Sequence, residues 1–239
     1  MIIQTNRLQP ILCLSLALSF LRQSTLAQPT PADSIPAARA AIFYQSYIGQ
    51  DAAIYNGVAY QPDYRGIEGN PWFESPNLVS GSLVYEDLTY THIPLMYDLV
   101  LDDLVIADPK GQTLILAPEK VQQFTLGNHT FIYQPANRTP GFYERLSSGY
   151  ASLYVRHKKK IEEKLESAQL LRFISSHDDY ILFKQEHYYP VPSANHLLTL
   201  LSDKKQQLRQ FQHAQHIRFK KDPAAAMQAI VDHYNQLPH

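Results

Sequence analysis

The feature that most constrains this chain is a series of short apolar segments between Val79 and Tyr133. Each segment is rich in β-branched or aromatic residues, and turn-forming runs such as Asp108-Pro109-Lys110-Gly111 separate one segment from the next. A new segment begins roughly every 8–12 residues, which is typical of an antiparallel β-meander in a sandwich, an open sheet or a barrel. The segments are 81–85, 93–98, 104–107, 112–116, 121–126 and 129–133.

Further strands are predicted on both sides of this meander. Asn56-Gly57 between apolar residues predicts a small hairpin over Ile54–Tyr60. Two more hairpins are expected after the meander, and Ser147-Ser148-Gly149 closes the first of them. The charged run Lys158–Ala168 predicts a solvated extension or a short helix. His177-Asp178-Asp179 resembles a histidine–carboxylate pair, but its position favours a turn. The strands of these two hairpins are 141–146 with 150–157, and 180–184 with 187–191.

After Pro192 the apolar spacing changes from two residues to about 3.6 residues, which predicts helices. Ser193 and Asp203 are suitable N-caps for two helices. Asp222 followed by Pro223 suits the start of a third. The apolar stripes of the three helices are Leu197, Leu198, Leu200 and Leu201; Leu208 and Phe211; and Met227, Ile230, Val231 and Tyr234.

These elements predict an α+β fold. Its body is an antiparallel β-meander, as an open sheet or a partial barrel, with C-terminal helices and a short N-terminal helix over Ala37–Ile48. The predicted organisation is a signal peptide, a Pro-rich spacer, a β-rich domain and a helical C-terminal segment packed on the same domain. Their bounds are 1–27, 28–36, 37–192 and 193–239.

The first 27 residues have the three parts of a Sec-type signal peptide. Arg7 is positively charged, Ile11–Leu21 is apolar, and Ala27 is the small residue expected at a cleavage site. An apolar run of this length is well short of the ~20 residues that a membrane-spanning helix needs, although Arg22 directly after it leaves an uncleaved anchor as the alternative. Cys13 follows a leucine, where a lipoprotein signal requires a small residue. We therefore expect export, to the periplasm or beyond, with cleavage near Ala27 and no lipidation.

Cleavage after Ala27 would remove the only cysteine and leave 212 of the 239 residues. The mature chain would then have no disulfide, no thiol nucleophile and no cysteine-ligated zinc site. Two arginines also leave with the signal peptide, so the formal charge changes from −1 to −3. This near-neutral balance gives no electrostatic reason to expect nucleic acid as a partner.

Two groups of side chains resemble metal sites but are incomplete. His213 and His216 lie three residues apart on a predicted helix, yet a zinc site needs a third and a fourth ligand. Asp232 and His233 would supply them only through a tertiary contact, so solvated helix histidines are the favoured interpretation. A group of acids lacks the spacing of a calcium loop and fits ordinary turn chemistry. These acids are Asp98, Asp102, Asp103 and Asp108.

The sequence contains no Gly-x-Ser-x-Gly elbow, no phosphate-binding glycine loop and no His-Glu-x-x-His motif. We therefore assign no catalytic, cofactor-binding or metal-binding residue and no cofactor. The 16 tyrosines and 10 phenylalanines either fill the sheet or offer a partner contact surface. Basic residues near the C-terminus predict a solvated helix face, with an acidic partner or anionic head groups as the alternative. They are Lys204, Lys205, Arg209, Arg218, Lys220 and Lys221.

The pattern Gly81-x-Leu83-x-Tyr85, followed by Leu95-x-Tyr97-Asp98-Leu99 and Gly141-Phe142-Tyr143, resembles a group of exported β-rich proteins of Bacteroidota type. The resemblance extends over most of the mature chain, including the helical tail at 197–234. It implies an exported protein with a β-rich body and a helical tail. Because the matching residues are scaffold residues and the group has no established activity, the resemblance assigns no functional residue.

We expect a non-enzymatic envelope protein that binds another component, such as a second envelope protein. The alternative is a carrier that holds a small apolar ligand inside a curled sheet, in a cavity lined by residues such as Leu83, Leu95 and Phe124. A carboxylate-dependent hydrolase is the third hypothesis. No transmembrane span is expected after the signal peptide is removed.

Overall fold

The computed structural model describes residues 53–134, 139–167 and 169–239, and all of these belong to one unit, Tyr44–His239. The strands are β1 (Val58–Ala59), β2 (Val79–Tyr85), β3 (Leu88–Asp98), β4 (Asp103–Ala107), β5 (Thr113–Ile115), β6 (Val121–Leu126), β7 (His129–Gln134), β8 (Gly141–Ser147), β9 (Ala151–Glu166), β10 (Gln169–Lys184) and β11 (His187–Pro190). The helices are α2 (Ala194–Leu200), α3 (Lys205–Ala214) and α4 (Pro223–Gln236), with 3₁₀ turns η3 (Ala53–Tyr55), η4 (Pro118–Lys120) and η5 (Ser202–Lys204).

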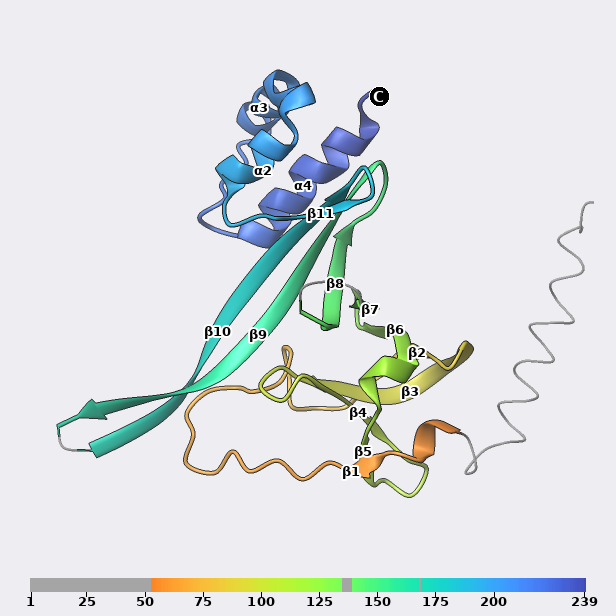
Figure 1. Cartoon of the computed structure of the whole chain (residues 1–239). Helices are drawn as coiled ribbons and strands as arrows, with labels where there is room; N and C mark the ends of the chain where they lie inside the picture. The colour runs from red at the N-terminus through yellow and green to blue at the C-terminus, as the bar shows by residue number, and fades with distance from the viewer. Residues whose placement is uncertain (1–52, 135–138, 168) are drawn as a thin grey trace, which may run out of the picture. The chain divides into compact units, whose positions relative to one another are not determined.

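The strands in the described part of the chain form one antiparallel sheet with the order β1-β5-β4-β3-β2-β6-β7-β8-β9-β10-β11 (Figure 1). Most neighbours in the sheet are neighbours in the sequence, as a meander requires. β1 and β11 are the two edges of this order, so the sheet is open. The predicted antiparallel sheet with C-terminal helices is confirmed. The helix predicted over Ala37–Ile48, the spacer and the signal peptide lie outside the described residues.

Apolar side chains pack into two main cores. The first contains Leu83, Leu95 and Phe124, all fully buried, together with other aromatic residues of β3 to β8. The rings of Phe124 and Phe131 are stacked with their centroids 4.7 Å apart. The second core joins residues of β9 and β10 to all three helices. Its fully buried members include Leu153, Leu182, Leu197, Leu208, Ile230 and Tyr234.

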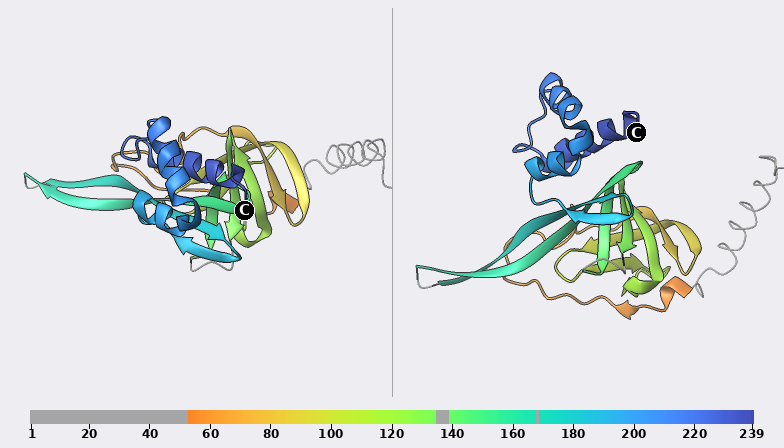
Figure 2. Two further views of the ribbon diagram at one scale, coloured as in Figure 1. Left: turned by 90° about the horizontal axis from the view of Figure 1, so that it is seen from above. Right: turned by 45° about the horizontal axis from the view of Figure 1, so that its top comes forward.

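The three helices lie beside the β8–β11 end of the sheet (Figure 2). The predicted caps of α2 and α4 are confirmed, because the Ser193 side chain accepts from the His196 N–H and the Asp222 side chain accepts from the Ala225 N–H. The predicted cap at Asp203 is wrong. This aspartate lies inside η5 and accepts instead from the Lys184 ammonium at 2.8 Å and the Tyr234 hydroxyl at 2.9 Å.

The small hairpin predicted over Ile54–Tyr60 does not form. Residues 53–55 make a 3₁₀ turn, and β1 pairs with the distant strand β5. Gly57 allows β1 and β5 to approach each other closely, because a Cβ at this position would lie 2.4 Å from the carbonyl oxygen of Ile115. The Asn-Gly pair therefore marks a tight strand contact and not a turn.

Two segments between the predicted hairpins are strands. Lys158–Glu166 continues β9 and is largely exposed beyond Lys159, so the predicted solvated extension is confirmed and the alternative short helix is wrong. His177-Asp178-Asp179 lies within β10, so the predicted turn is wrong. β9 and β10 pair with each other without a register shift from Ala151–Lys184 to Glu166–Gln169. Cross-strand pairing over this length stabilises charged sequences that lack strand propensity of their own.

Candidate functional site

Five acidic and histidine side chains form a continuous series, joined by three hydrogen bonds and one ion pair, that reaches across β7, β8, β9 and β10. Glu144 stands at the centre, with Oε1 2.6 Å from Nδ1 of His129 and Oε2 2.7 Å from Nε2 of His157. Nδ1 of His157 lies 2.7 Å from Oδ1 of Asp178. Nε2 of His129 lies 3.2 Å from Oε1 of Glu74. We call these five residues the carboxylate–histidine chain.

The alternation of side chains along neighbouring strands explains why these groups meet. Asp178 is directly opposite His157 in the β9–β10 pair, and Glu144 is opposite Phe131 in the β7–β8 pair. His129 precedes Phe131 by two residues and therefore shares its face of the sheet. His129, Glu144 and His157 follow one another diagonally across β7, β8 and β9, and Asp178 then lies directly opposite His157 on β10.

Phe73, from the loop between β1 and β2, covers this face. Its ring centroid lies 4.9 Å from that of His129, 5.3 Å from that of His157 and 5.1 Å from that of Phe131. The side chains of Glu144 and His157 are 9% and 16% exposed. The centre of the chain is thus largely shielded from water, which strengthens its charge-assisted hydrogen bonds.

The electrostatics fix the protonation of the two central groups. Burial disfavours the charged form of His157, but hydrogen bonds to Asp178 and Glu144 outweigh burial and raise its pKa to about 9. Burial also acts to raise the pKa of Glu144, but hydrogen bonds from His157 and His129 reverse this and lower it. At neutral pH an imidazolium is therefore held between two carboxylates. Both of its nitrogens are occupied, so it cannot take a proton from a nucleophile, and its effect is to tie β8, β9 and β10 together.

A cleft of about 840 Å³ opens beside Asp178, between β10, β11 and the start of α4. This volume falls within the roughly 300–1,000 Å³ of ligand sites. Burial and the neighbouring Asp178 raise the pKa of Tyr180 to about 12, so its hydroxyl remains a hydrogen-bond donor. The apolar and aromatic lining residues include Tyr143, Tyr180, Ile181, Tyr188, Val191, Phe219 and Met227.

One wall of the cleft is an unpaired strand edge. β11 pairs with β10 only from Ile181 onward, and the Tyr180 carbonyl accepts from the Val191 N–H. Alternate residues of a strand direct their backbone groups to the same side, so those of Ser176 and Asp178 also point to this edge. Neither residue forms a backbone hydrogen bond there with another described residue.

The charged groups of the cleft are mostly paired. Lys158 Nζ lies 2.5 Å from Oδ2 of Asp179, and Nε2 of His177 lies 2.9 Å from Oδ1 of the same aspartate. Lys220 lines the cleft from the loop before α4 and is exposed. It forms no ion pair with another residue in the described ranges. The cleft thus combines an apolar wall, an open backbone edge and a single unpaired ammonium among its described lining.

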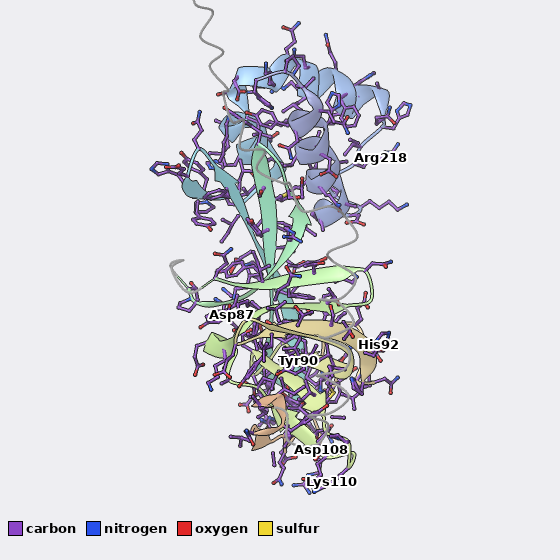
Figure 3. All side chains as sticks on the ribbon, turned by 90° about the vertical axis from the view of Figure 1, so that its right-hand side faces the viewer. Asp87, Tyr90, His92, Asp108, Lys110 and Arg218 are labelled. Carbon is purple, nitrogen blue, oxygen red and sulfur yellow. The ribbon has the colours of Figure 1, made fainter. Side chains whose placement is uncertain are left out.

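The acids that the sequence grouped as a candidate calcium site serve separate structural roles. Asp98 is fully buried and accepts from the Tyr60 and Tyr64 hydroxyls at 2.8 and 2.6 Å. Asp102 accepts from the Tyr97 hydroxyl and pairs with the Arg156 guanidinium. Burial and the neighbouring Asp98 and Asp102 raise the pKa of Asp103. Asp108 caps the β4–β5 turn, where Figure 3 also shows Lys110.

The histidines and acids of the C-terminal segment do not assemble into a metal site either. His213 and His216 are exposed at the end of α3. The ring of His233 stacks on Phe211 at 3.9 Å, and Asp232 accepts from the Ser147 hydroxyl at 2.5 Å. Among the described residues no group of three histidine, cysteine or carboxylate side chains has the geometry to hold a metal ion.

Sequence reasoning missed His129, Glu144 and His157 and placed Asp178 in a turn. Each of the first three has polar neighbours in its own strand, Glu144 beside Arg145 and His157 within Arg156–Lys160, so no local spacing distinguishes it. The only available indication is that all three alternate in phase with buried neighbours of their strands. That indication identifies a face but does not pair one strand with another.

Comparison of the chain with protein-family models, with curated proteins and with solved structures finds no match. Within the described residues, no helix has both the length and the apolar character needed to cross a membrane. The functional conclusion therefore depends on the site geometry and the sequence.

Proposed function

We propose that the protein is an exported, non-enzymatic binding module of the cell envelope, and that its cleft holds an extended polypeptide segment of a partner. Export follows from the N-terminal sequence, in which Arg7, the apolar run Ile11–Leu21 and Ala27 have the order of a signal peptide. The binding role follows from the cleft, whose residues offer contact surface and hydrogen-bonding groups but no nucleophile beside a free base.

The observation that carries this proposal is the open edge of β10 inside the cleft. The backbone groups of Asp178, which lines the cleft, and of Ser176, next along the same strand edge, have no described hydrogen-bond partner there, and an added strand would satisfy them as in β-augmentation complexes. Next to this edge, Ile181, Val191 and Met227 supply an apolar wall. Tyrosine rings supply rigid area with little loss of conformational entropy on binding.

A carrier of a small apolar ligand is the second candidate. Leu83, Leu95 and Phe124, the residues that the sequence proposed as its lining, are fully buried in a packed core. The cleft offers a different place, because Val191 and Met227 form an apolar end that is 2% and 5% exposed. A carrier would use this end and leave the β10 edge unoccupied.

The deciding experiment has two steps. Peptides that bind the mature chain are first selected from a displayed random library. Amide hydrogen exchange of the mature chain is then measured with and without a selected peptide. Peptide binding by strand addition should slow exchange at the amides of Ser176 and Asp178, since these amides point to the open edge. Ala194, which lines the cleft, provides the test variant Ala194→Trp. Ala214, exposed at the end of α3, provides the matched control Ala214→Trp.

Strand addition predicts that Ala194→Trp abolishes peptide binding and that Ala214→Trp preserves it. Peptides that bind without slowing exchange at Ser176 and Asp178 would refute strand addition. Native mass spectrometry of protein from its own envelope fraction separates the second candidate. A small apolar compound that is retained by Ala214→Trp and lost from Ala194→Trp would establish the carrier function instead.

A further inference from the structure

The outer half of β9 presents a strand edge that other described elements leave unpaired. β8 pairs with β9 only at residues 153–155, and beyond Lys159 the backbone of β9 is hydrogen-bonded to β10 alone. Figure 1 shows β9 and β10 continuing past the neighbouring strands as a two-stranded arm. Residues 160 and 162–166 of this arm are exposed, and Leu165 is 72% exposed.

Two sets of hydrogen bonds fix which backbone groups point to the free edge. The Lys159 N–H donates outward, to the Leu99 carbonyl, at 3.2 Å. On the opposite strand Arg172 and Ile174, which pair with Glu163 and Ile161, direct their own groups away from β9 to Glu68. By strand alternation, the N–H and C=O groups of residues 161, 163 and 165 face outward and form no bond with another described element.

The sequence along this edge is complementary to itself in reverse. Residues 160–166 are Lys-Ile-Glu-Glu-Lys-Leu-Glu. A two-fold axis through Glu163 would set Lys160 opposite Glu166 and Glu162 opposite Lys164, and each pairing would occur twice. It would also set Ile161 opposite Leu165. Because Glu163 has outward-facing backbone groups, this register gives about six inter-strand backbone hydrogen bonds between the two copies.

The other strand of the arm extends this complementarity. Leu165 is opposite Leu170 and Ile161 is opposite Ile174 within one chain. In a paired arm these would form apolar rows across four strands, one on each side of the axis. The two Glu163 side chains would meet at the axis, where like charges oppose pairing, but each has Arg172 of its own chain 3.4 Å away.

We propose that this edge binds a second copy of the chain, as an isologous antiparallel dimer centred on Glu163. Charge complementarity favours a second copy of the chain as the partner at this edge. Lysine on an edge strand often serves to prevent pairing, but here each lysine faces a glutamate in the two-fold register. Pairing would convert an exposed two-stranded ribbon, which is marginal by itself, into four strands. It would also cover Leu165 and Leu170, which are 72% and 59% exposed.

A charge-swap series tests this dimer by sedimentation velocity of the mature chain at about 100 µM, a concentration suited to a small interface. Lys160→Glu places glutamate opposite Glu166, and Glu166→Lys places lysine opposite Lys160. Because like charges directly opposite are destabilising, each single variant should self-associate at least about tenfold more weakly than the wild type. Lys110→Glu, an exposed lysine in the β4–β5 turn (Figure 3), is the control with the same charge change.

The two single variants should form a heterodimer when mixed, since glutamates at 160 and 166 on one chain then face lysines on the other. This rescue also shows that neither variant failed merely because its arm was misfolded. The double variant Lys160→Glu/Glu166→Lys should regain self-association. A monomeric wild type, or a mixture that remains monomeric, would overturn the proposal. Neither measurement involves the cleft, so this inference stands or fails independently of the proposed function.

Discussion

Replacing His157 by glutamine should remove most of the pH dependence of folding stability between about pH 6.5 and 9. In the folded protein, hydrogen bonds to Asp178 and Glu144 outweigh burial and raise the pKa of His157 from 6.5 to about 9. A raised pKa means that the protonated imidazole stabilises the fold fully below about pH 6.5, and that this contribution is lost as the pH rises through about 9.

The expected magnitude follows from the same two pKa values. A difference from 6.5 to about 9 corresponds to about 3 kcal/mol of unfolding free energy. The side chain is only 16% exposed, so solvent screening reduces this figure little. Between pH 7 and 9 the wild type should lose about 1 kcal/mol per pH unit. His157→Gln should be less stable by about 3 kcal/mol at pH 6.5 and should approach the wild type near pH 9.

Urea denaturation at half-unit steps from pH 6 to 9.5 measures this directly, with far-ultraviolet circular dichroism as the probe. His213→Gln is the matched control, because this histidine is exposed on α3 and has no hydrogen bond from its side chain to another described residue. It should reproduce the wild-type curve. If His157→Gln and the wild type lose stability in parallel over this range, the charged His157 at the centre of the carboxylate–histidine chain is refuted.

Three further predictions concern the scaffold around the site. Asp98→Asn should cost about 3 kcal/mol in urea denaturation, because one oxygen accepts from the Tyr60 and Tyr64 hydroxyls and the other from two backbone N–H groups. An amide NH₂ must therefore either face the two N–H donors or leave both hydroxyls without their shared acceptor; full stability would contradict this. Asp222→Ala should cost about 1 kcal/mol by the same assay through loss of the α4 N-cap, and an unchanged midpoint would exclude the cap. Gly57→Ala should cost about 1–3 kcal/mol and speed amide exchange in β5, since its Cβ would lie 2.4 Å from the Ile115 carbonyl oxygen; unchanged exchange would refute the close contact.

Local sequence was sufficient to predict the structure wherever segments that are close in the chain also pair in space. The meander was predictable because strands β2–β3, β3–β4, β4–β5 and β6–β7 are joined by short turns that contain Asp, Gly or Asn. The caps at Ser193 and Asp222 were predictable for the same reason, since each side chain bonds to a backbone N–H three residues later. These interactions need no knowledge of the rest of the fold.

Prediction failed where distant pairing decides local structure. The triple lysine at 158–160 and the pair of aspartates at 178–179 have low strand propensity, and both look like the end of a strand. In the structure, Lys158 bonds with Asp179, and His157 bonds with Asp178. The two aspartates are thus compatible with a strand because His157 and Arg156 lie opposite them and Lys158 is diagonal to Asp179. Neither run identifies its partner through the spacing of its own residues.

The dependence on distant pairing also accounts for the carboxylate–histidine chain. Polar residues in strand interiors, which sequence reasoning treats as breaks, are retained here because each has an oppositely charged partner across the sheet. Glu144 is buried between two histidines, and His157 between two carboxylates, so removing one group leaves a buried charge without compensation. This coupling holds Asp178 in place at the open edge of β10. A cleft whose wall depends on paired charges should therefore loosen when the pH rises through the pKa of His157, and ligand affinity there should fall in the same range in which stability falls.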